Sequence, residues 1–256
     1  MPKGVYSAAS AMYVEAQTLD VTARNLAHAT TTGYRRETAF RRGFDQALAE
    51  QRGQTGGLEG NGGVGILSQG SSFSFTEGGR ETTGAPYDLA LAGEGFFQVK
   101  KPGGEVLLTR AGHFQTDAQG RLVTPEGFFL QGQGGAITVP EGAEAVTVDR
   151  DGRVSVATTA GGIRNDQVIE QLRLVKVDKP EALRAINGQY FDPGTLTQTD
   201  ANITVHQGEL EKSNIDPLRE LVDMIAIQRR YDAAQKALKE QSTAGQGFTE
   251  LLRGNA

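Results

Sequence analysis

The N-terminal segment carries a heptad pattern of apolar side chains. Its spacing alternates strictly between four and three residues, at Val5, Ala9, Met12, Ala16, Leu19, Ala23 and Leu26. Such a repeat is typical of a helix that buries a narrow seam against a second helix. We therefore predict a helix from about Gly4 to Ala29 that stops near Gly33. Because alanine fills every second seam position, a partner helix can approach closely.

A second helix is predicted near the C-terminus and can supply that partner. Asp216 is a suitable N-cap, and Pro217 fits a first helical turn. Apolar residues follow at helical spacing, at Leu218, Leu221, Val222, Ile225, Tyr231 and Leu238. We expect this helix to reach about Gln241, because Gly245 and Gly247 weaken any continuation.

Between the two helices the sequence changes to a strand pattern. From Ser72 to Val205, short β-branched and aromatic runs are separated by residues that favour turns. Hairpin or turn chemistry occurs at Lys101–Gly104, Asp117–Gly120, Pro125–Gly127 and Asp149–Gly152. Within this region only Pro180–Ile186 is predicted as a short helix, and Gln51–Gly65 is predicted as a glycine-rich loop.

The predicted fold class is α+β and mainly β. An all-β domain of short antiparallel strands is inserted between N- and C-terminal helices that pair as a coiled coil. The predicted segments are a helix and turn at 1–36, a Gly-rich connecting segment at 37–71, a β-domain at 72–207 and a C-terminal helix at 208–256.

Composition excludes several classes of function. The chain has no cysteine, which rules out disulfides, thiol nucleophiles and cysteine-ligated zinc. Its net charge of −5 gives no general attraction to nucleic acid, so the cluster Arg35, Arg36, Arg41 and Arg42 is interpreted as inter-subunit ion pairing or a solvated face. No apolar stretch is long enough for membrane insertion, and the N-terminus lacks a secretory pattern, so we expect no export by the general secretory route.

No residue pattern indicates catalysis or metal binding. His28, His113 and His206 lie in different segments without metal-ligand spacing. Asp149–Gly152 begins like a calcium loop but lacks the bidentate Glu that should follow. Neither a phosphate-binding loop nor a nucleophile elbow is present. We therefore predict no enzyme activity, no catalytic residues, no cofactor and no metal site.

Several motifs resemble those of the bacterial flagellar axial proteins, the rod and hook family. The N-terminal one is Asn25–Arg36, NLAHATTTGYRR, in which His28 and Thr30 replace the usual Asn. Two β motifs follow, YDLALAGEGFFQV at Tyr87–Val99 and LTRAGHF at Leu108–Phe114. Near the C-terminus, GELEKSN at Gly208–Asn214 and LVDMI at Leu221–Ile225, followed by QRRY at Gln228–Tyr231, complete the series in the family's order.

The resemblance implies a structural subunit of the flagellar basal-body rod, distal or proximal. Such a subunit polymerises head-to-tail into a helical tube through its terminal helices, with itself and with other rod and hook subunits as partners. It is exported by the flagellar type III apparatus to the periplasm-spanning rod. The implied assembly interface comprises Val5, Met12, Leu19, Asn25, Leu26, Gly33, Tyr34, Arg35, Leu221, Met224, Ile225, Gln228, Tyr231 and Leu238.

Three alternatives remain open at this point. The chain could be another axial protein such as a hook subunit, although it is shorter than is usual for one. A secreted β-rich binding or adhesive module would use the terminal helices only as linkers. A hydrolase would need an unrecognised constellation in the β-domain, and monomeric ligand binding, turnover or ordered tubes would distinguish these classes.

Overall fold

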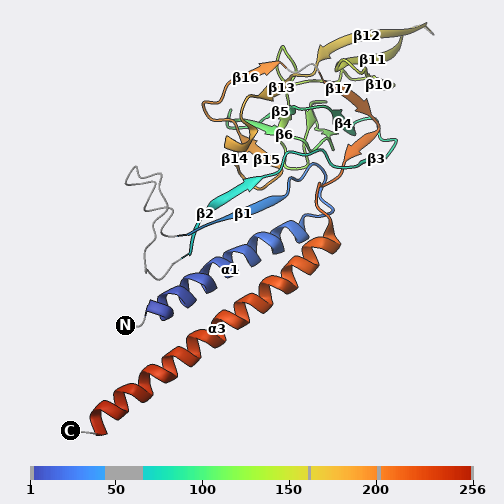
Figure 1. Ribbon diagram of the computed structural model, residues 1–256. Helices are drawn as coiled ribbons and strands as arrows, with labels where there is room; N and C mark the ends of the chain where they lie inside the picture. Colours follow the sequence, from blue (N-terminus) through green and yellow to red (C-terminus); the bar gives the residue numbers. More distant parts are fainter. Residues whose placement is uncertain (1–2, 44–65, 161–162, 201–202, 255–256) are drawn as a thin grey trace. The chain divides into compact units, whose positions relative to one another are not determined.

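The computed structural model describes residues 3–43, 66–160, 163–200 and 203–254 (Figure 1). The predicted glycine-rich loop at Gln51–Gly65 lies outside these ranges. The chain divides into two compact units. The helical unit comprises residues 1–27, 37–72 and 216–256, and the β unit comprises residues 28–36 and 73–215. Residues 28–36, which the sequence suggests grouping with the N-terminal helix, thus belong to the β unit.

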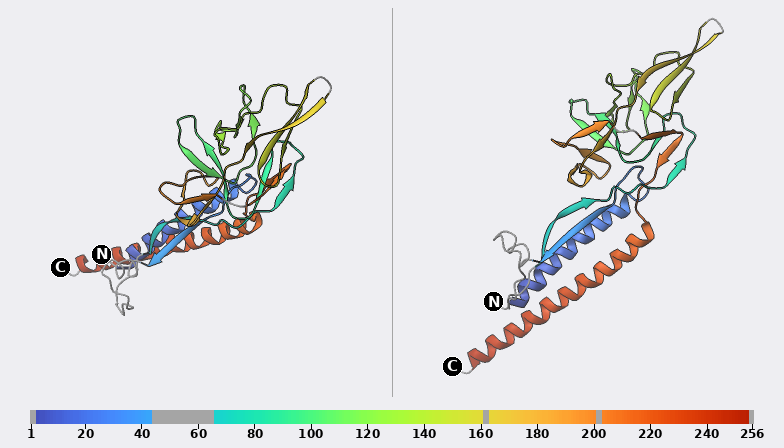
Figure 2. Two further views of the ribbon diagram at one scale, coloured as in Figure 1. Left: turned by 90° about the horizontal axis from the view of Figure 1, so that it is seen from above. Right: turned by 45° about the horizontal axis from the view of Figure 1, so that its top comes forward.

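The helical unit consists of two helices and a two-stranded sheet. Helix α1 (Lys3–Ala27) and helix α3 (Pro217–Gly254) run antiparallel and side by side (Figures 1 and 2). Strand β1 (Glu37–Gly43) pairs with β2 (Ile66–Phe73), and β1 also contacts α1. The bounds of α1 agree closely with the predicted helix, whereas the sequence analysis predicted neither β1 nor β2.

Helix α3 begins at Pro217, as its capping residues predict, so residues 208–216 of the predicted helical segment are not helical, and it ends later than predicted. The Asp216 carboxylate accepts hydrogen bonds from the backbone N–H groups of Leu218, at 3.0 Å, and Arg219, at 3.4 Å, so it caps the helix. The expected end near Gln241 is wrong, because α3 continues to Gly254 through both Gly245 and Gly247. A glycine inside a helix costs only about 1 kcal/mol relative to alanine, which good helix formers on either side can offset.

The β unit is built from short antiparallel strands. Its largest sheet has the order β14-β15-β6-β5-β9-β8-β7, with β13 pairing to β5 and to β16. These strands are β5 (Phe96–Lys100), β6 (Val106–Thr109), β7 (Gln115–Thr116), β8 (Leu122–Val123), β9 (Phe129–Leu130), β13 (Leu174–Val177), β14 (Arg184–Ala185), β15 (Tyr190–Asp192) and β16 (Gln198–Asp200). The predicted α+β, mainly β fold class is confirmed.

Smaller sheets complete the β unit. The strands β10 (Ala145–Val148), β11 (Arg153–Ala160) and β12 (Ile163–Gln171) form a three-stranded meander. The C-terminal part of the unit returns to its beginning, since β17 (Thr204–Gln207) pairs with β4 (Leu89–Ala92) and β18 (Glu209–Glu211) pairs with β3 (Arg80–Thr82). The segment that leads into α3 is therefore part of the sheet structure.

The predicted turns are found, and one predicted helix is not. The backbone N–H of Asp149 donates to the Arg153 carbonyl and closes the β10–β11 hairpin at Asp149–Gly152. Of the expected helix at Pro180–Ile186, only one 3-10 turn forms at Pro180–Ala182. Leu183 is extended and buried in a hydrophobic cluster around Phe96 and Phe191. Burial of that side chain outweighs the weak helix preference and draws the next residues into β14.

Candidate assembly surface and the buried polar network

The most buried residues of α1 are ones that the heptad pattern does not mark. On α1 the buried apolar residues are Val14 and Val21, and on α3 the buried apolar residue is Ile227. The carboxylate of Glu15, also buried, accepts hydrogen bonds from Arg230 Nε at 3.2 Å. This ion pair defines the register of the two antiparallel helices.

The predicted seam on α1 is not the buried stripe. Ala9, Ala16 and Ala23 are exposed and form a surface that we call the alanine face, while Met12, Leu19 and Leu26 are only half-buried. The side chain of Val5 lies outside the described part of the chain. The prediction of a buried seam is wrong for the alanines, because polar residues occupy the buried side of α1 instead.

The polar residues on the buried side of α1 have partners there. The Thr18 hydroxyl donates to the Val14 carbonyl at 2.8 Å, and the Thr22 hydroxyl donates to the Thr18 carbonyl at 2.9 Å. Hydroxyls bonded in this way can be buried without leaving a polar group unpaired. The heptad pattern could not reveal this, because it weighs apolar residues alone.

The apolar residues of α3 lie on two opposite sides of the helix. Met224, Tyr231 and Leu238 are half-buried and share the side of Ile227. The other side carries four exposed apolar residues that we call the α3 stripe, with exposed fractions of 71% for Leu218, 43% for Leu221, 59% for Val222 and 52% for Ile225. Gln228 is exposed as well. The sequence predicted a single apolar stripe on this helix. That prediction is wrong, because Leu218, Leu221, Val222 and Ile225 lie on a separate, exposed side.

Asn25 links the C-terminal end of α1 to β1 through two hydrogen bonds. Its side-chain amide donates to the Glu37 carbonyl at 2.8 Å, and its carbonyl oxygen accepts from the Glu37 N–H at 2.9 Å. Asn25 is only 1% exposed. The Glu37 carboxylate in turn accepts from Arg24 at 3.0 Å. Asn25 is therefore occupied within its own chain, and its place in the assembly interface stays a prediction.

The turn at residues 28–36 also has buried residues, at positions 33–35. Tyr34 stacks on His28 with ring centroids 4.7 Å apart, and Tyr34 and Arg35 are both buried. Gly33 has a positive φ of 67° and its N–H donates to the Glu211 carbonyl at 2.8 Å. The expectation that Tyr34 and Arg35 project from the turn is wrong, because both are buried. A role of Gly33, Tyr34 and Arg35 in contacts between subunits stays a prediction. The interpretation of Arg35 as part of an exposed basic cluster fails because Arg35 is buried, while the Arg41 and Arg42 side chains lie outside the described ranges.

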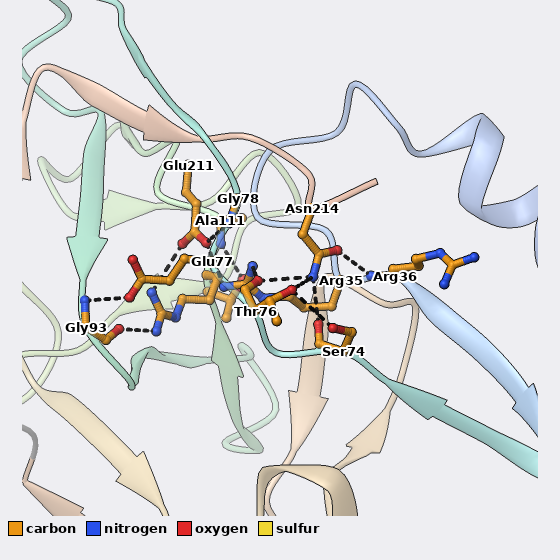
Figure 3. A network of polar contacts seen from close by, with 12 residues as sticks. Arg35, Arg36, Ser74, Thr76, Glu77, Gly78, Gly93, Ala111, Glu211 and Asn214 are labelled. Carbon is orange, nitrogen blue, oxygen red and sulfur yellow. Dashed lines mark hydrogen bonds and ion pairs between the residues drawn. The ribbon is translucent and has the colours of Figure 1, made fainter. Parts of the chain in front are cut away.

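Arg35 belongs to a buried polar network of the β unit (Figure 3). One guanidinium N–H donates to Glu211 Oε1 at 2.7 Å and another donates to the Thr76 carbonyl at 2.8 Å. The second oxygen of Glu211 accepts from Arg110 at 3.2 Å. All three charged side chains are at most 3% exposed. A single carboxylate thus pairs with two guanidiniums away from water.

Backbone groups and one amide complete the network. The Gly78 N–H also donates to Glu211 Oε1, at 3.0 Å, and Arg110 donates to the Gly93 carbonyl. Asn214 accepts from the Arg36 N–H at 2.7 Å and donates to the Ser74 carbonyl at 2.8 Å. Burial lowers the pKa of the Arg110 guanidinium, the charge of Glu211 opposes that shift, and Arg35 adds to it. Glu211 thus offsets part of the cost of burying the two charged guanidiniums.

One pocket of the β unit lies beside this network. It has a volume of about 480 Å³, with Arg35 and Arg110 in its wall together with Phe75, Phe96 and Val177. At its edge Lys176 donates to Glu94 at 2.6 Å, which lowers the pKa of the Glu94 carboxyl. The wall residues include no histidine or cysteine.

Other classes of site are not found in the described part of the chain. No group of acidic or histidine side chains there could hold a metal ion. His113 instead contacts the buried Asp88 carboxylate at 2.7 Å. No described helix has the length and apolar character needed to cross a membrane.

Sequence reasoning missed the residues at the centre of the network. Glu211, Arg110 and Asn214 come from segments distant from residue 35, so no local pattern connects them. A signal did exist, because all three lie inside family-like motifs, GELEKSN and LTRAGHF. The motifs marked these residues without indicating which partner each one has.

Two regions of the chain match known protein families. Residues 90–156 match the family described as flagellar hook protein FlgE/F/G D1 domain, and residues 206–243 match the flagellar basal body rod FlgEFG protein C-terminal family. A flagellar basal-body rod protein FlgF of Caulobacter vibrioides is 34% identical over 98% of both chains. The chain belongs to the flagellar basal-body rod protein family.

Relatives of two kinds match this rod-family chain at similar identity. A rod protein FlgG of Caulobacter vibrioides is 31% identical over 96% of this chain and 97% of its own. A rod protein FlgF of Salmonella typhimurium is 31% identical over 90% of this chain and 91% of its own. The matched regions include Arg110, Glu211 and the start of α3, whereas Arg35 lies outside both of them.

Proposed function

We propose that this chain is a structural subunit of the flagellar basal-body rod that polymerises head-to-tail through its terminal helices. The observation that carries the proposal is the pair of apolar surfaces left on α1 and α3, the alanine face and the α3 stripe. Family membership supports the rod as the place of assembly.

The exposed α3 stripe argues for a partner. Four large apolar residues within two helical turns are an unusual surface for a chain that remains alone in water. The contact between α1 and α3 has residues of its own outside the stripe, among them the ion pair of Glu15 with Arg230. Burial of the stripe against another subunit would contribute about 25 cal/mol for each Å² of apolar surface removed from water. Assembly thus buries the apolar surface of the α3 stripe that folding leaves exposed.

The proposed interface is narrower than the one expected from the sequence. It retains the exposed residues Leu221, Ile225 and Gln228, and the half-buried residues of both helices contribute their outer edges. That half-buried set is Met12, Leu19, Leu26, Met224, Tyr231 and Leu238. Because different surfaces of one subunit meet, the contact is heterologous and can continue into a helical tube.

We further propose that the subunit reaches the rod through the flagellar type III export apparatus. A chain that passes through a narrow channel must do so unfolded, and the absence of cysteine means that no disulfide has to be avoided or reduced on the way. Rod and hook subunits of other kinds are its proposed neighbours. The proposal covers both the distal and the proximal part of the rod.

Deletion of the gene and imaging of basal bodies tests this function. Cells that lack the chain should build basal bodies whose rod stops short or is missing, and the wild-type gene should restore it. A tagged chain should appear in the rod of the restored structures. Complete rods in the deletion strain, or a tagged chain found only outside basal bodies, would exclude the proposal.

A further inference from the structure

The pocket beside the buried network has the size of a small-molecule site. Its volume of about 480 Å³ lies within the range of about 300 to 1,000 Å³ that such sites usually have. Its wall is formed by residues 75–76, 94–96 and 176–178, together with Arg35, Arg110 and Pro180. All of these residues belong to the β unit, so one compact unit supplies the wall.

Part of the wall is apolar and aromatic. The rings of Phe75 and Phe96 meet edge to face, with centroids 5.7 Å apart. Val177 and Pro180 belong to the same wall, and Phe96 and Val177 are buried. A flat apolar group packs well against aromatic rings in this arrangement. This part of the wall therefore suits the apolar body of a ligand.

The two arginines in the wall have more N–H groups than acceptors. A guanidinium carries five N–H groups. Among the described residues, Arg110 donates to Glu211 and to the Gly93 carbonyl, and Arg35 donates to Glu211 and to the Thr76 carbonyl. Both Nε atoms are buried and have no hydrogen-bond partner in that part of the chain. Because buried donors are normally satisfied, the two guanidiniums favour an acceptor that enters the pocket.

The buried charges beside the pocket favour an anion. Burial lowers the pKa of Arg110, and the neighbouring Arg35 adds to this shift. The carboxylates of Glu211 and of the exposed Glu77 oppose the shift without cancelling it. A further negative charge in the pocket would oppose it as well, and would itself be stabilised by the two guanidiniums.

The exposed wall residues limit the occupant to one negative charge. These residues include Lys176, Glu94 and Asp178, and Lys176 donates to Glu94 at 2.6 Å. The carboxylates of Glu94 and Asp178 would repel a dianion, since like charges at short distance oppose association. The wall thus suits a single carboxylate joined to an apolar body.

We infer that this pocket binds a small organic monocarboxylate with a flat apolar body. Its carboxylate faces Arg110 and Lys176, and its body packs against Phe75 and Phe96. The site lies in the β unit and does not involve the helices that the proposed function uses. Binding of such a ligand therefore goes beyond the proposed function and can be tested without assembled rods.

An NMR titration of the full chain with 3-phenylpropionate tests the site. This probe joins one carboxylate to one phenyl ring, whereas 3-phenylpropan-1-ol lacks the charge and acetate lacks the ring. With 3-phenylpropionate, the backbone amide signals of Gly95, Phe96 and Val177 should shift and saturate, while those of the β10–β12 meander should not. Each partial probe should bind at least about tenfold more weakly, because it lacks either the charge or the apolar body. No saturable shift at the three amides, or equal affinity for the alcohol, would overturn the inference.

A pair of lysine variants tests the orientation of the ligand. Lys176→Glu changes an exposed wall residue and should weaken binding of 3-phenylpropionate by about tenfold, because an attracting charge becomes a repelling one. The matched control is Lys179→Glu, since Lys179 is also exposed but is not a wall residue. Its affinity should stay within about twofold of wild type, because solvent and salt screen a more distant exposed charge. Equal weakening in both variants, or none in Lys176→Glu, would contradict the assigned position of the carboxylate.

Discussion

The Glu211 carboxylate lies 2.7 Å from a guanidinium nitrogen of Arg35, although the two residues are 176 positions apart in the sequence. Arg35 stands in the segment that follows α1, and Glu211 stands in the last strand before α3. The β unit therefore holds both of its chain ends through one buried ion pair. A structural subunit that uses its two terminal helices for assembly benefits from such a fixed junction.

Replacing Glu211 by Gln should destabilise the β unit strongly. The change removes the carboxylate that Arg35 and Arg110 share, and breaking a buried pair in this way costs about 3 to 5 kcal/mol. Urea unfolding followed by near-UV circular dichroism measures the effect on the aromatic core. Glu81→Gln is the control, because Glu81 pairs with Lys212 at the surface. Its replacement should lower the free energy of unfolding by less than about 1 kcal/mol. Equal decreases in the free energy of unfolding of both variants would show that the buried network stabilises the β unit no more than a surface ion pair does.

Replacing Gly33 by Ala should cost more than the same change at Gly84. Both glycines have a positive φ, 67° and 71°, so both changes introduce the backbone strain of about 1 kcal/mol. An added Cβ at Gly33 would also lie 2.3 Å from the Ala111 backbone nitrogen, whereas nothing lies within 4 Å of one at Gly84. The free energies of unfolding of the two variants test this difference. Similar losses would mean that the turn at residues 28–36 can move away from Ala111.

Replacing Asn25 by Ala should loosen the junction of α1 and β1. The Glu37 N–H and carbonyl would both lose their buried partner, at a cost of about 1 to 3 kcal/mol for each unpaired group. Hydrogen exchange at the Glu37 amide reports on this directly, and its protection should fall. The control Tyr13→Ala removes an exposed side chain from the same helix. Unchanged protection at Glu37 in Asn25→Ala would contradict the assigned hydrogen bonds.

Asp117 should titrate below its ordinary range. Partial desolvation alone would raise the pKa of this carboxyl, but hydrogen bonds from the Arg121 side chain and from the backbone of Arg121 and Gln119 outweigh it and hold the pKa below 3.8. A pKa lowered by folding means that the stabilisation is present above the unfolded pKa and is lost as the pH falls through the folded one. The unfolding free-energy difference between wild type and Asp117→Asn should therefore shrink at acid pH. A carboxyl titration by NMR with a midpoint at or above 3.8 would contradict this.

The sequence predicts where the helices lie better than it predicts what they contact. The repeat from Val5 to Leu26 located α1 within two residues at each end, because helical periodicity is a local property. It did not identify the buried side, since the partner of α1 includes β1 as well as α3. Thr18, Thr22 and Asn25 fill that side through hydrogen bonds, which a pattern of apolar residues cannot reveal.

The buried network could not be predicted from sequence for a different reason. The run at Arg35 and Arg36 looks like a surface cluster, because arginine is rarely buried without a partner. Its partner Glu211 comes from β18, and only the pairing of β18 with β3 and of β17 with β4 brings that strand into place. The burial of Arg35 is thus a consequence of the whole β topology.

The claim that rods assemble through the exposed sides of the terminal helices is tested most directly by one substitution in the α3 stripe. Ile225→Asp should leave the chain folded, because Ile225 is 52% exposed, while burying a carboxylate in each subunit contact should cost about 3 kcal/mol or more. The control Ala233→Asp introduces the same residue into the same helix outside the stripe. Electron microscopy of basal bodies should show rods of normal length with Ala233→Asp and shortened or absent rods with Ile225→Asp. Rods of wild-type length with folded, exported Ile225→Asp protein would contradict the account.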